Sequence, residues 1–256
     1  MHTLHRIKAY LNHWLDAVDA HSLHSPFLYE LYTQVIKQES LPDPAIEKLR
    51  KKLLNDHRMI AVDDLGAGSK HADSHQRLIS EIAHHSLTTP AFASLYDRLA
   101  TYFNARIIVE LGTSLGITSL YLAREAERKV YTFEGSPALA EIATISFEFA
   151  GSNNITLIEG NIDQTLPYLL TGLPKVDMVF MDANHRYEPT VRYFELLVRR
   201  THEHSLIIID DIHDQAEMEK AWRTVQRHPL VYTTIDLFRC GLVFVNPALS
   251  KQHYAW

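Results

Sequence analysis

Acidic side chains close two of the apolar segments in the second half of the sequence. Asp182 follows the run Val176–Met181, and Asp210 and Asp211 follow the run Leu206–Ile209. The carboxyl ends of parallel strands meet at one edge of a sheet, so we expect these three carboxylates to converge there. Carboxylates this close raise one another's pKa unless a cation neutralises them. Oxygen ligands without cysteine suit Mg²⁺ or another hard divalent ion, so Asp182, Asp210 and Asp211 are predicted metal ligands.

A histidine stands three residues after the first of these acids. An imidazole can accept a proton from a substrate hydroxyl at neutral pH, so Asp182 and His185 are the predicted catalytic residues. A second interpretation stays open. In it, Asp182 lines a cofactor, the Asp210-Asp211 pair caps the following helix, and His185 is a helix-capping or surface residue.

The segment Glu110-Leu-Gly112-Thr-Ser-Leu-Gly116 is a further chemical signal, because it links a predicted strand to a predicted helix. Glycines let a backbone approach a ligand closely. The spacing is not the Gly-x-Gly-x-x-Gly of dinucleotide sites, and Glu110 would repel a pyrophosphate. A nucleoside with a positive charge, such as S-adenosylmethionine, fits better. Glu134, at the end of the next predicted strand, can accept hydrogen bonds from both ribose hydroxyls.

Strands and helices alternate from residue 107 onward. The predicted strands are Ile107–Leu111, Val130–Phe133, Ile155–Ile158, Val176–Met181 and Leu206–Ile209, with helices near 116–126, 137–150, 163–170, 188–200 and 214–227. This alternation predicts a mostly parallel sheet covered on both faces. The short link between Val231–Leu237 and Gly241–Val245 makes that last pair antiparallel. The predicted fold class is therefore α/β, with a doubly wound, mostly parallel seven-stranded sheet whose last strand is antiparallel.

The first 58 residues are predicted to form a helical appendage. Apolar residues recur there at helical spacing, namely Leu4, Ile7, Leu11, Trp14, Leu15 and Val18. Ser25 is a plausible N-cap for a second helix that begins at Pro26. We interpret residues 1–58 as a cap or dimerisation element and residues 59–256 as the domain that carries the chemistry.

Taken in order, these motifs resemble class I S-adenosylmethionine-dependent methyltransferases, and within them the catechol and caffeoyl-CoA type O-methyltransferases. The resemblance runs from about Ser86 to Val245. The segment Val109–Thr118 is very similar to the first motif of that group, and Leu87-Thr-Thr-Pro90 to its segment that closes over the cofactor. The resemblance implies a Rossmann-like methyltransferase fold that binds S-adenosylmethionine. The implied cofactor-binding residues are Glu110, Gly112, Thr113, Ser114, Gly116, Thr118, Glu134, Gly135, Ser136, Gly160, Asn161, Ile162 and Asp182.

The same resemblance implies individual roles. Glu110 would bind the methionine amino group or order water near it, Thr118 would face the carboxylate, and Glu134 would hold the ribose. Asn161 stands where the family usually has an acid that reaches the adenine amino group, and its amide oxygen could accept that bond.

The sequence departs from the catechol-type pattern at two positions. Asp211 replaces the usual amide and His185 the usual lysine, an arrangement that looks more like the sugar and macrolide, or macrocin-type, O-methyltransferases. The predicted function is transfer of a methyl group to a hydroxyl of a small molecule, assisted by a divalent metal. The alternatives are a metal-independent methyltransferase for another acceptor atom, a non-catalytic relative that binds the cofactor, and a nicotinamide oxidoreductase.

The composition of the chain limits the kinds of partner that it is expected to bind. The 256 residues carry a net charge of −6 without a basic stripe, which argues against a nucleic-acid partner. Cys240 is the single cysteine, which excludes an internal disulfide. No apolar run suits a signal peptide or a membrane span, so a cytoplasmic protein without a membrane partner is expected. A homodimer is the default symmetry. The segment Asp63–Ser69 is interpreted as a loop, either over the active site or on the surface.

Overall fold

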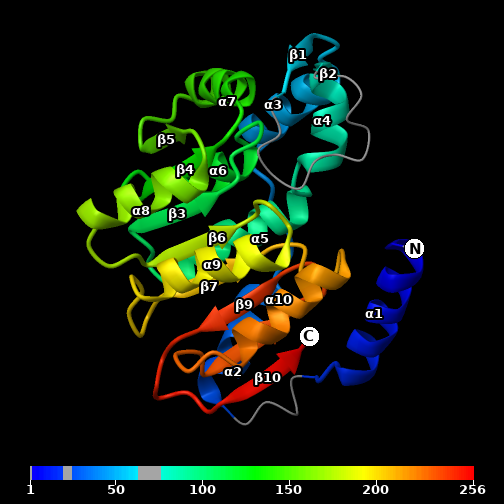
Figure 1. Ribbon diagram of the computed structural model, residues 1–256, viewed down its shortest axis with the longest axis vertical. Coiled ribbons are helices and arrows are strands. Elements are labelled where there is room, and N and C mark those ends of the chain that lie inside the picture. The colour runs from blue at the N-terminus through cyan, green and yellow to red at the C-terminus, as the bar shows by residue number, and fades with distance from the viewer. Residues whose placement is uncertain (1, 20–24, 63–75) are drawn as a thin grey trace. The chain divides into compact units, whose positions relative to one another are not determined.

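The computed structural model describes residues 2–19, 25–62 and 76–256, and divides the chain into two compact units (Figure 1). Unit 1 consists of residues 1–38 and 174–256, and unit 2 of residues 39–173. The predicted boundary after residue 58 stays a prediction, and the segment Asp63–Ser69 lies outside the described residues. None of the described helices is long and apolar enough to cross a membrane.

Unit 2 is built on three parallel strands. Its elements are α3 (Pro44–Leu54), β1 (Met59–Ala61), β2 (Gln76–Leu78), α4 (Ile79–Ser86), α5 (Pro90–Tyr102), β3 (Ile107–Leu111), α6 (Ile117–Leu122), β4 (Lys129–Glu134), α7 (Pro137–Ala150), β5 (Ile155–Glu159) and α8 (Ile162–Gly172). β4 lies between β3 and β5 and is parallel to both, in a register that sets Glu110 beside Thr132 and Glu134 beside Glu159. Glu110 of β3 and Glu134 of β4 therefore lie toward the same edge of the sheet, at the carboxyl ends of their strands, as predicted.

A continuous apolar core holds the helices of unit 2 together. α3, α4, α6 and α7 contribute to it, with Leu49, Ile82, Tyr121 and Phe147 among its buried members. α6 is shorter than the predicted 116–126 because the chain leaves the helix at Ala123. The Asn154 side-chain amide donates hydrogen bonds to three carbonyls of that turn, including the Ala123 carbonyl at 2.9 Å.

Unit 1 combines parallel strands with one antiparallel strand. Its elements are α1 (His2–Asp16), α2 (Pro26–Leu31), the π-helical turn η2 (Tyr32–Ile36), β6 (Met178–Met181), α9 (Tyr187–Val198), β7 (Leu206–Ile209), α10 (Ala216–Gln226), β8 (Thr233–Asp236), β9 (Gly241–Phe244) and β10 (Gln252–Ala255). β6 pairs parallel with β7, whereas β9 runs antiparallel to both β7 and β8. The predicted antiparallel pair is therefore confirmed.

The sequence did not predict β10, whose Gln-His-Tyr-Ala run has no apolar alternation and which pairs parallel with β8. β6 and β7 are buried along their whole length, which explains their continuous apolar runs. The predicted cap of α2 is present, since the Leu28 amide donates to Ser25 Oγ at 3.5 Å and Pro26 is the first helical residue. The expected fold class, a mostly parallel sheet with flanking helices and an N-terminal helix, is confirmed.

Candidate active site

The loop between β3 and α6 has the backbone form that its glycines permit. Gly112 and Gly116 adopt φ values of 97° and 84°, and Ser114 between them has a φ of 49°. The amides of Gly112 and Thr113 both donate to the Phe133 carbonyl, at 3.1 and 3.0 Å. The loop is thereby tied to the end of β4. This left-handed turn exposes backbone where a ligand can approach it.

Glu134 is fixed in place by the same loop. Its Oε2 accepts a hydrogen bond from the Ser114 amide at 2.8 Å, and its Oε1 accepts one from the Ser136 amide at 2.9 Å. Glu134 is half-buried, so a ligand can reach a carboxylate that the backbone holds in place. The geometry suits the role in ribose binding that the resemblance implies.

Glu110 is completely buried, unlike Glu134. Ser119, in the first turn of α6, donates a hydrogen bond to its Oε2, while its buried Oε1 has no hydrogen-bond partner. Burial raises the pKa of Glu110 to about 7, although the side chains of Ser119 and Thr132 oppose the shift. An unsatisfied buried carboxylate oxygen is costly. Such an atom fits an ordered water or a cationic ligand group better than it fits an empty core.

The other predicted cofactor residues of unit 2 lie around these two acids. Thr118 donates to Thr88 Oγ1 at 3.1 Å, which links α6 to the Leu87–Pro90 segment. Asn161 is exposed and caps α8 by accepting the Asp163 amide at 2.9 Å, which leaves one lone pair of its oxygen for another donor. The remaining members are the buried Thr113, Ser136 and Ile162, with Gly135 and Gly160 beside the last two.

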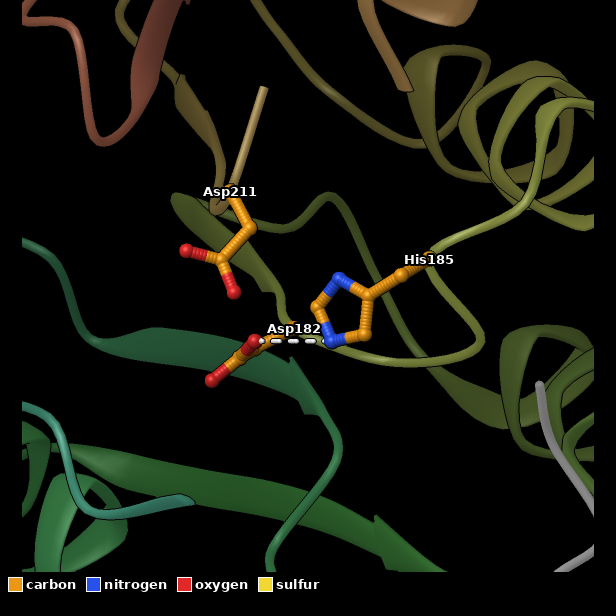
Figure 2. Close-up of side chains that lie close together, drawn as sticks. All are labelled: Asp182, His185 and Asp211. Carbon is orange, nitrogen blue, oxygen red and sulfur yellow. Dashed lines mark ion pairs between the residues drawn. The ribbon is translucent and has the colours of Figure 1, made fainter. Parts of the chain in front are cut away.

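Three side chains of unit 1 that could bind a metal ion or accept a proton lie together in the loops that follow β6 and β7. Asp182, His185 and Asp211 each offer one ligand atom, and these atoms all lie within 4.8 Å of one another. His185 Nε2 is 3.4 Å from Asp182 Oδ1. Figure 2 shows the imidazole facing both carboxylates. The predicted convergence of strand-end acids is therefore realised for Asp182 and Asp211.

Unusual backbone conformations position this group. Asn184, His185 and Asp211 have φ values of 66°, 32° and 53°, a region that non-glycine residues occupy at a cost. Side-chain bonds support the first loop, because Asn184 Nδ2 donates to Tyr193 Oη at 2.9 Å and Gln215 Nε2 donates to the His185 carbonyl at 3.3 Å. Strained residues of this kind concentrate where function needs a fixed geometry.

Asp210 occupies a different environment from its neighbour Asp211. Its buried carboxylate forms an ion pair with Arg239, whose Nη2 lies 2.8 Å from Oδ2, and the structure does not bring it into the group around His185. Burial and the charge of Asp210 raise the pKa of Asp211 above its usual range, although His185 and Arg239 oppose the shift. Asp211 is thus the member of the pair that would gain most from a cation.

The donor set fits a divalent cation. Two carboxylates and an imidazole within reach of one another can coordinate Mg²⁺, and the nitrogen ligand also suits Mn²⁺ or Zn²⁺. His185 Nδ1 is buried, and no residue in the described part of the chain forms a hydrogen bond with it. This nitrogen is therefore available to a ligand. Asp182 and Asp211 are the predicted ligands in this group, and His185 joins them here.

Sequence reasoning missed two residues that shape the site. Ser119 is the partner of Glu110, and its place one turn into a predicted helix could have indicated that it faces the strand. Arg239 lies in the short link between the last two strands, and no local pattern shows that it returns to Asp210.

Comparisons with known proteins agree with this geometry. A model described as a methyltransferase domain matches residues 109–212. The chain is 32% identical over 146 residues to a catechol O-methyltransferase of Mycobacterium tuberculosis, covering 51% of this chain and 64% of that one. It is 30% identical over 128 residues to a catechol O-methyltransferase of Niastella koreensis, covering 48% and 57%. The chain thus spans less than two thirds of the length of these two relatives.

A solved structure shows the same fold. An O-methyltransferase from Bacillus cereus superposes with a TM-score of 0.60 over 85% of this chain and 97% of that one, at 18% identity. The fold is that of class I S-adenosylmethionine-dependent methyltransferases. The resemblance that the motifs predicted, to the O-methyltransferase group of that class, is confirmed by the matched domain and the relatives.

Proposed function

We propose that this protein transfers a methyl group from S-adenosylmethionine to a hydroxyl of a small molecule, with a divalent cation held by Asp182 and Asp211 and with His185 beside them as the proton acceptor. The observation that carries the proposal is the convergence of these three groups after β6 and β7. The names of the two curated relatives, both catechol O-methyltransferases, support the choice of oxygen as the acceptor atom.

Residues of unit 2 would hold the cofactor. Glu134, fixed by two backbone amides, would accept hydrogen bonds from the ribose hydroxyls. Glu110 would act from beneath the loop, through a water on its unpartnered Oε1, to favour the cationic methionine end. A positive ligand would stabilise the ionised form of this acid, because an opposite charge nearby lowers the pKa of a carboxyl group.

S-adenosylmethionine supplies an electrophilic methyl group, and a divalent cation supplies a Lewis acid that makes a hydroxyl more nucleophilic. The chain supplies orientation and proton handling. Asp182 and Asp211 would hold the cation, and positive φ values at Asn184, His185 and Asp211 fix the two loops that carry these carboxylates. His185, whose Nε2 lies 3.4 Å from Asp182 Oδ1, would take up the hydroxyl proton.

The test is methyl transfer measured by mass spectrometry with deuterated S-adenosylmethionine. The acceptors are a catechol, a monohydroxylated aromatic and a sugar, each assayed with EDTA, Mg²⁺ or Mn²⁺. We expect transfer to one class of hydroxyl that EDTA abolishes. Asp182→Asn and Asp211→Asn should each lower kcat/KM by about 100-fold, because a Lewis acid contributes several kcal/mol to the transition state.

Glu203→Gln is the matched control, since this acid of unit 1 is exposed and its ion pair is with the neighbouring, equally exposed His204. It should leave the rate unchanged. Transfer that is insensitive to EDTA and to both Asp variants would overturn the metal-assisted mechanism. Cofactor binding without transfer to any hydroxyl would favour a different acceptor atom or a non-catalytic role.

A further inference from the structure

A buried arginine of unit 2 has one donor nitrogen without a partner. Arg50 lies on α3, which packs beside α4 in the apolar core (Figure 1), and only 8% of its side chain is exposed. Its Nη2 is buried, and no described residue forms a hydrogen bond with it. A guanidinium keeps its positive charge in proteins, so a buried donor of this group that lacks an acceptor costs stability.

The other nitrogens of Arg50 fix the guanidinium in place. Its Nε donates to both carboxylate oxygens of Glu47, at 3.1 and 2.9 Å, and its Nη1 donates to the Thr88 carbonyl at 2.7 Å. Glu47 in turn accepts a hydrogen bond from Tyr121 Oη at 2.8 Å. The guanidinium is therefore held beside Thr88 before any ligand binds, while Nη2 stays without an acceptor.

A second buried arginine of the same unit shows a purely structural arrangement. Only 2% of the Arg128 side chain is exposed. Its Nη1 donates to Asp97 Oδ1 at 2.7 Å and to the Leu122 carbonyl at 3.2 Å, and its Nη2 donates to Thr101 Oγ1 at 2.6 Å. Both terminal nitrogens thus have acceptors. The contrast indicates that Nη2 of Arg50 awaits an acceptor that the described chain does not provide.

Hydrogen bonds connect Arg50 to the first turn of α6, directly after the glycine-containing loop. Thr88, whose carbonyl Arg50 holds, accepts a hydrogen bond from Thr118 Oγ1 at 3.1 Å. The next residue, Ser119, donates to Glu110, whose buried Oε1 has no partner. Successive helical residues point about 100° apart, so these two connections leave the turn in different directions. A buried base with a spare donor and a buried acid with a spare acceptor therefore flank this turn.

This pair of groups suits a zwitterion. An α-amino acid carries an ammonium and a carboxylate on one carbon, and the methionine end of S-adenosylmethionine is such a group. Glu110 favours the positive part of that end, because opposite charges attract. Arg50 offers the carboxylate a full positive charge and a planar set of donors, which match carboxylate geometry better than a neutral hydroxyl does.

We propose that Arg50 is a specificity-determining residue for the cofactor, which recognises the carboxylate of its methionine end. The inference rests on the proposed function, because it takes S-adenosylmethionine as the ligand of unit 2. It adds a residue of α3 to the cofactor residues, all of which come from β3 onward. Glu47 orients the guanidinium in advance, which lowers the cost of ordering it when the ligand binds.

The test is isothermal titration calorimetry with two ligands that differ only in the carboxylate, namely S-adenosylhomocysteine and its decarboxylated analogue. The wild type should bind S-adenosylhomocysteine about 10- to 100-fold more tightly, the range expected for a hydrogen bond between charged groups. Arg50→Met should remove most of this preference and leave the affinity for the decarboxylated analogue within about twofold of the wild type. Lys51→Met is the matched control, because it removes an exposed positive charge from the same helix and should keep the preference.

Two further variants guard against a folding defect. Glu47→Gln together with Arg50→Met removes both partners, so that no carboxylate is left unpaired, and it should also lose the preference. Arg50→Lys keeps the charge and should retain part of it. Thermal unfolding without ligand checks that each variant is folded.

The two ligands also separate this inference from the proposed function. A folded Arg50→Met variant that keeps the full preference, or one that weakens both ligands equally, would overturn the role of Arg50 and leave the proposed function intact. Equal affinity of the wild type for the two ligands would do the same. A wild type that binds neither ligand would overturn both proposals.

Discussion

A loop position can require glycine because its φ is positive or because a side chain would clash with a neighbour. Four glycines of this chain differ in which of these two conditions they meet. At Gly116, in the loop before α6, φ is +84° and an added Cβ would lie 2.7 Å from Phe147 Cε1 of α7. Gly151 has a φ of +68° with nothing within 4 Å of an added Cβ. At Gly241 an added Cβ would clash with the buried ring of Trp222, but the φ is not positive. At Gly172 there is neither a positive φ nor a clash.

The expected costs of alanine follow from these geometries. Gly172→Ala should be neutral or stabilise by up to about 1 kcal/mol, since it only restricts the unfolded chain. Gly151→Ala should cost about 1–2 kcal/mol for the left-handed conformation. Gly241→Ala should cost about 1–3 kcal/mol for overpacking. Gly116→Ala combines both and should cost about 2–5 kcal/mol.

Urea unfolding of the four variants measures these differences, and a double-mutant cycle with Phe147→Leu separates the packing contribution at Gly116. The cycle should show a coupling of at least about 1 kcal/mol, because the shorter side chain relieves the conflict. Gly116→Ala should also weaken binding of S-adenosylhomocysteine, whereas Gly151→Ala should not. A Gly116→Ala variant no less stable than Gly151→Ala would refute the packing argument.

Three further predictions concern titratable groups. Glu110 has a pKa of about 7, so if only its ionised form binds the cationic cofactor, affinity should rise about tenfold from pH 6 to pH 8, and calorimetry of Glu110→Gln should show no such rise. Asp236→Asn should lower the free energy of unfolding by about 2 kcal/mol at pH 6. The depressed pKa of Asp236 stabilises the fold above about pH 4, and this contribution is lost as the pH falls toward 2. The raised pKa of His13 adds stability below about pH 6.5 that is lost at higher pH. Urea titrations should therefore show the largest difference between wild type and variant between about pH 4 and 6.5, a smaller difference at higher pH, and none toward pH 2. His185→Gln should lower kcat by about 100-fold or more, and a variant that keeps the wild-type kcat would exclude His185 as the base.

The regular part of the fold was predictable because its signals are local. Buried strands such as Ile107–Leu111 and Leu206–Ile209 consist of continuous apolar residues, and their predicted bounds match the observed ones. β10 was not predictable, since its polar sequence is a strand only through pairing with β8. The early end of α6 depends on Asn154, which lies more than thirty residues beyond it.

In the candidate site, too, the features set by local sequence were predictable and those set by distant residues were not. Asp182 and Asp211 follow strands whose ends could be inferred, so their convergence could be predicted. The separation of Asp210 from Asp211 could not, because adjacent residues diverge through the positive φ of Asp211 and a distant arginine. The periodicity of α1 identified an apolar face but could not say whether the chain's own core covers it, and Ile7, Leu11 and Trp14 are exposed in the structure.

The central claim, that this chain uses S-adenosylmethionine, is tested most directly by isothermal titration calorimetry. The purified chain is titrated with S-adenosylmethionine, with S-adenosylhomocysteine and with a nicotinamide dinucleotide. We expect saturable binding of the first two and none of the third. Glu134→Gln should weaken both by about 10- to 100-fold, because a hydrogen bond to a charged group contributes about 1.5–3 kcal/mol. Dinucleotide binding without binding of either S-adenosyl compound would contradict the assignment of S-adenosylmethionine as the cofactor.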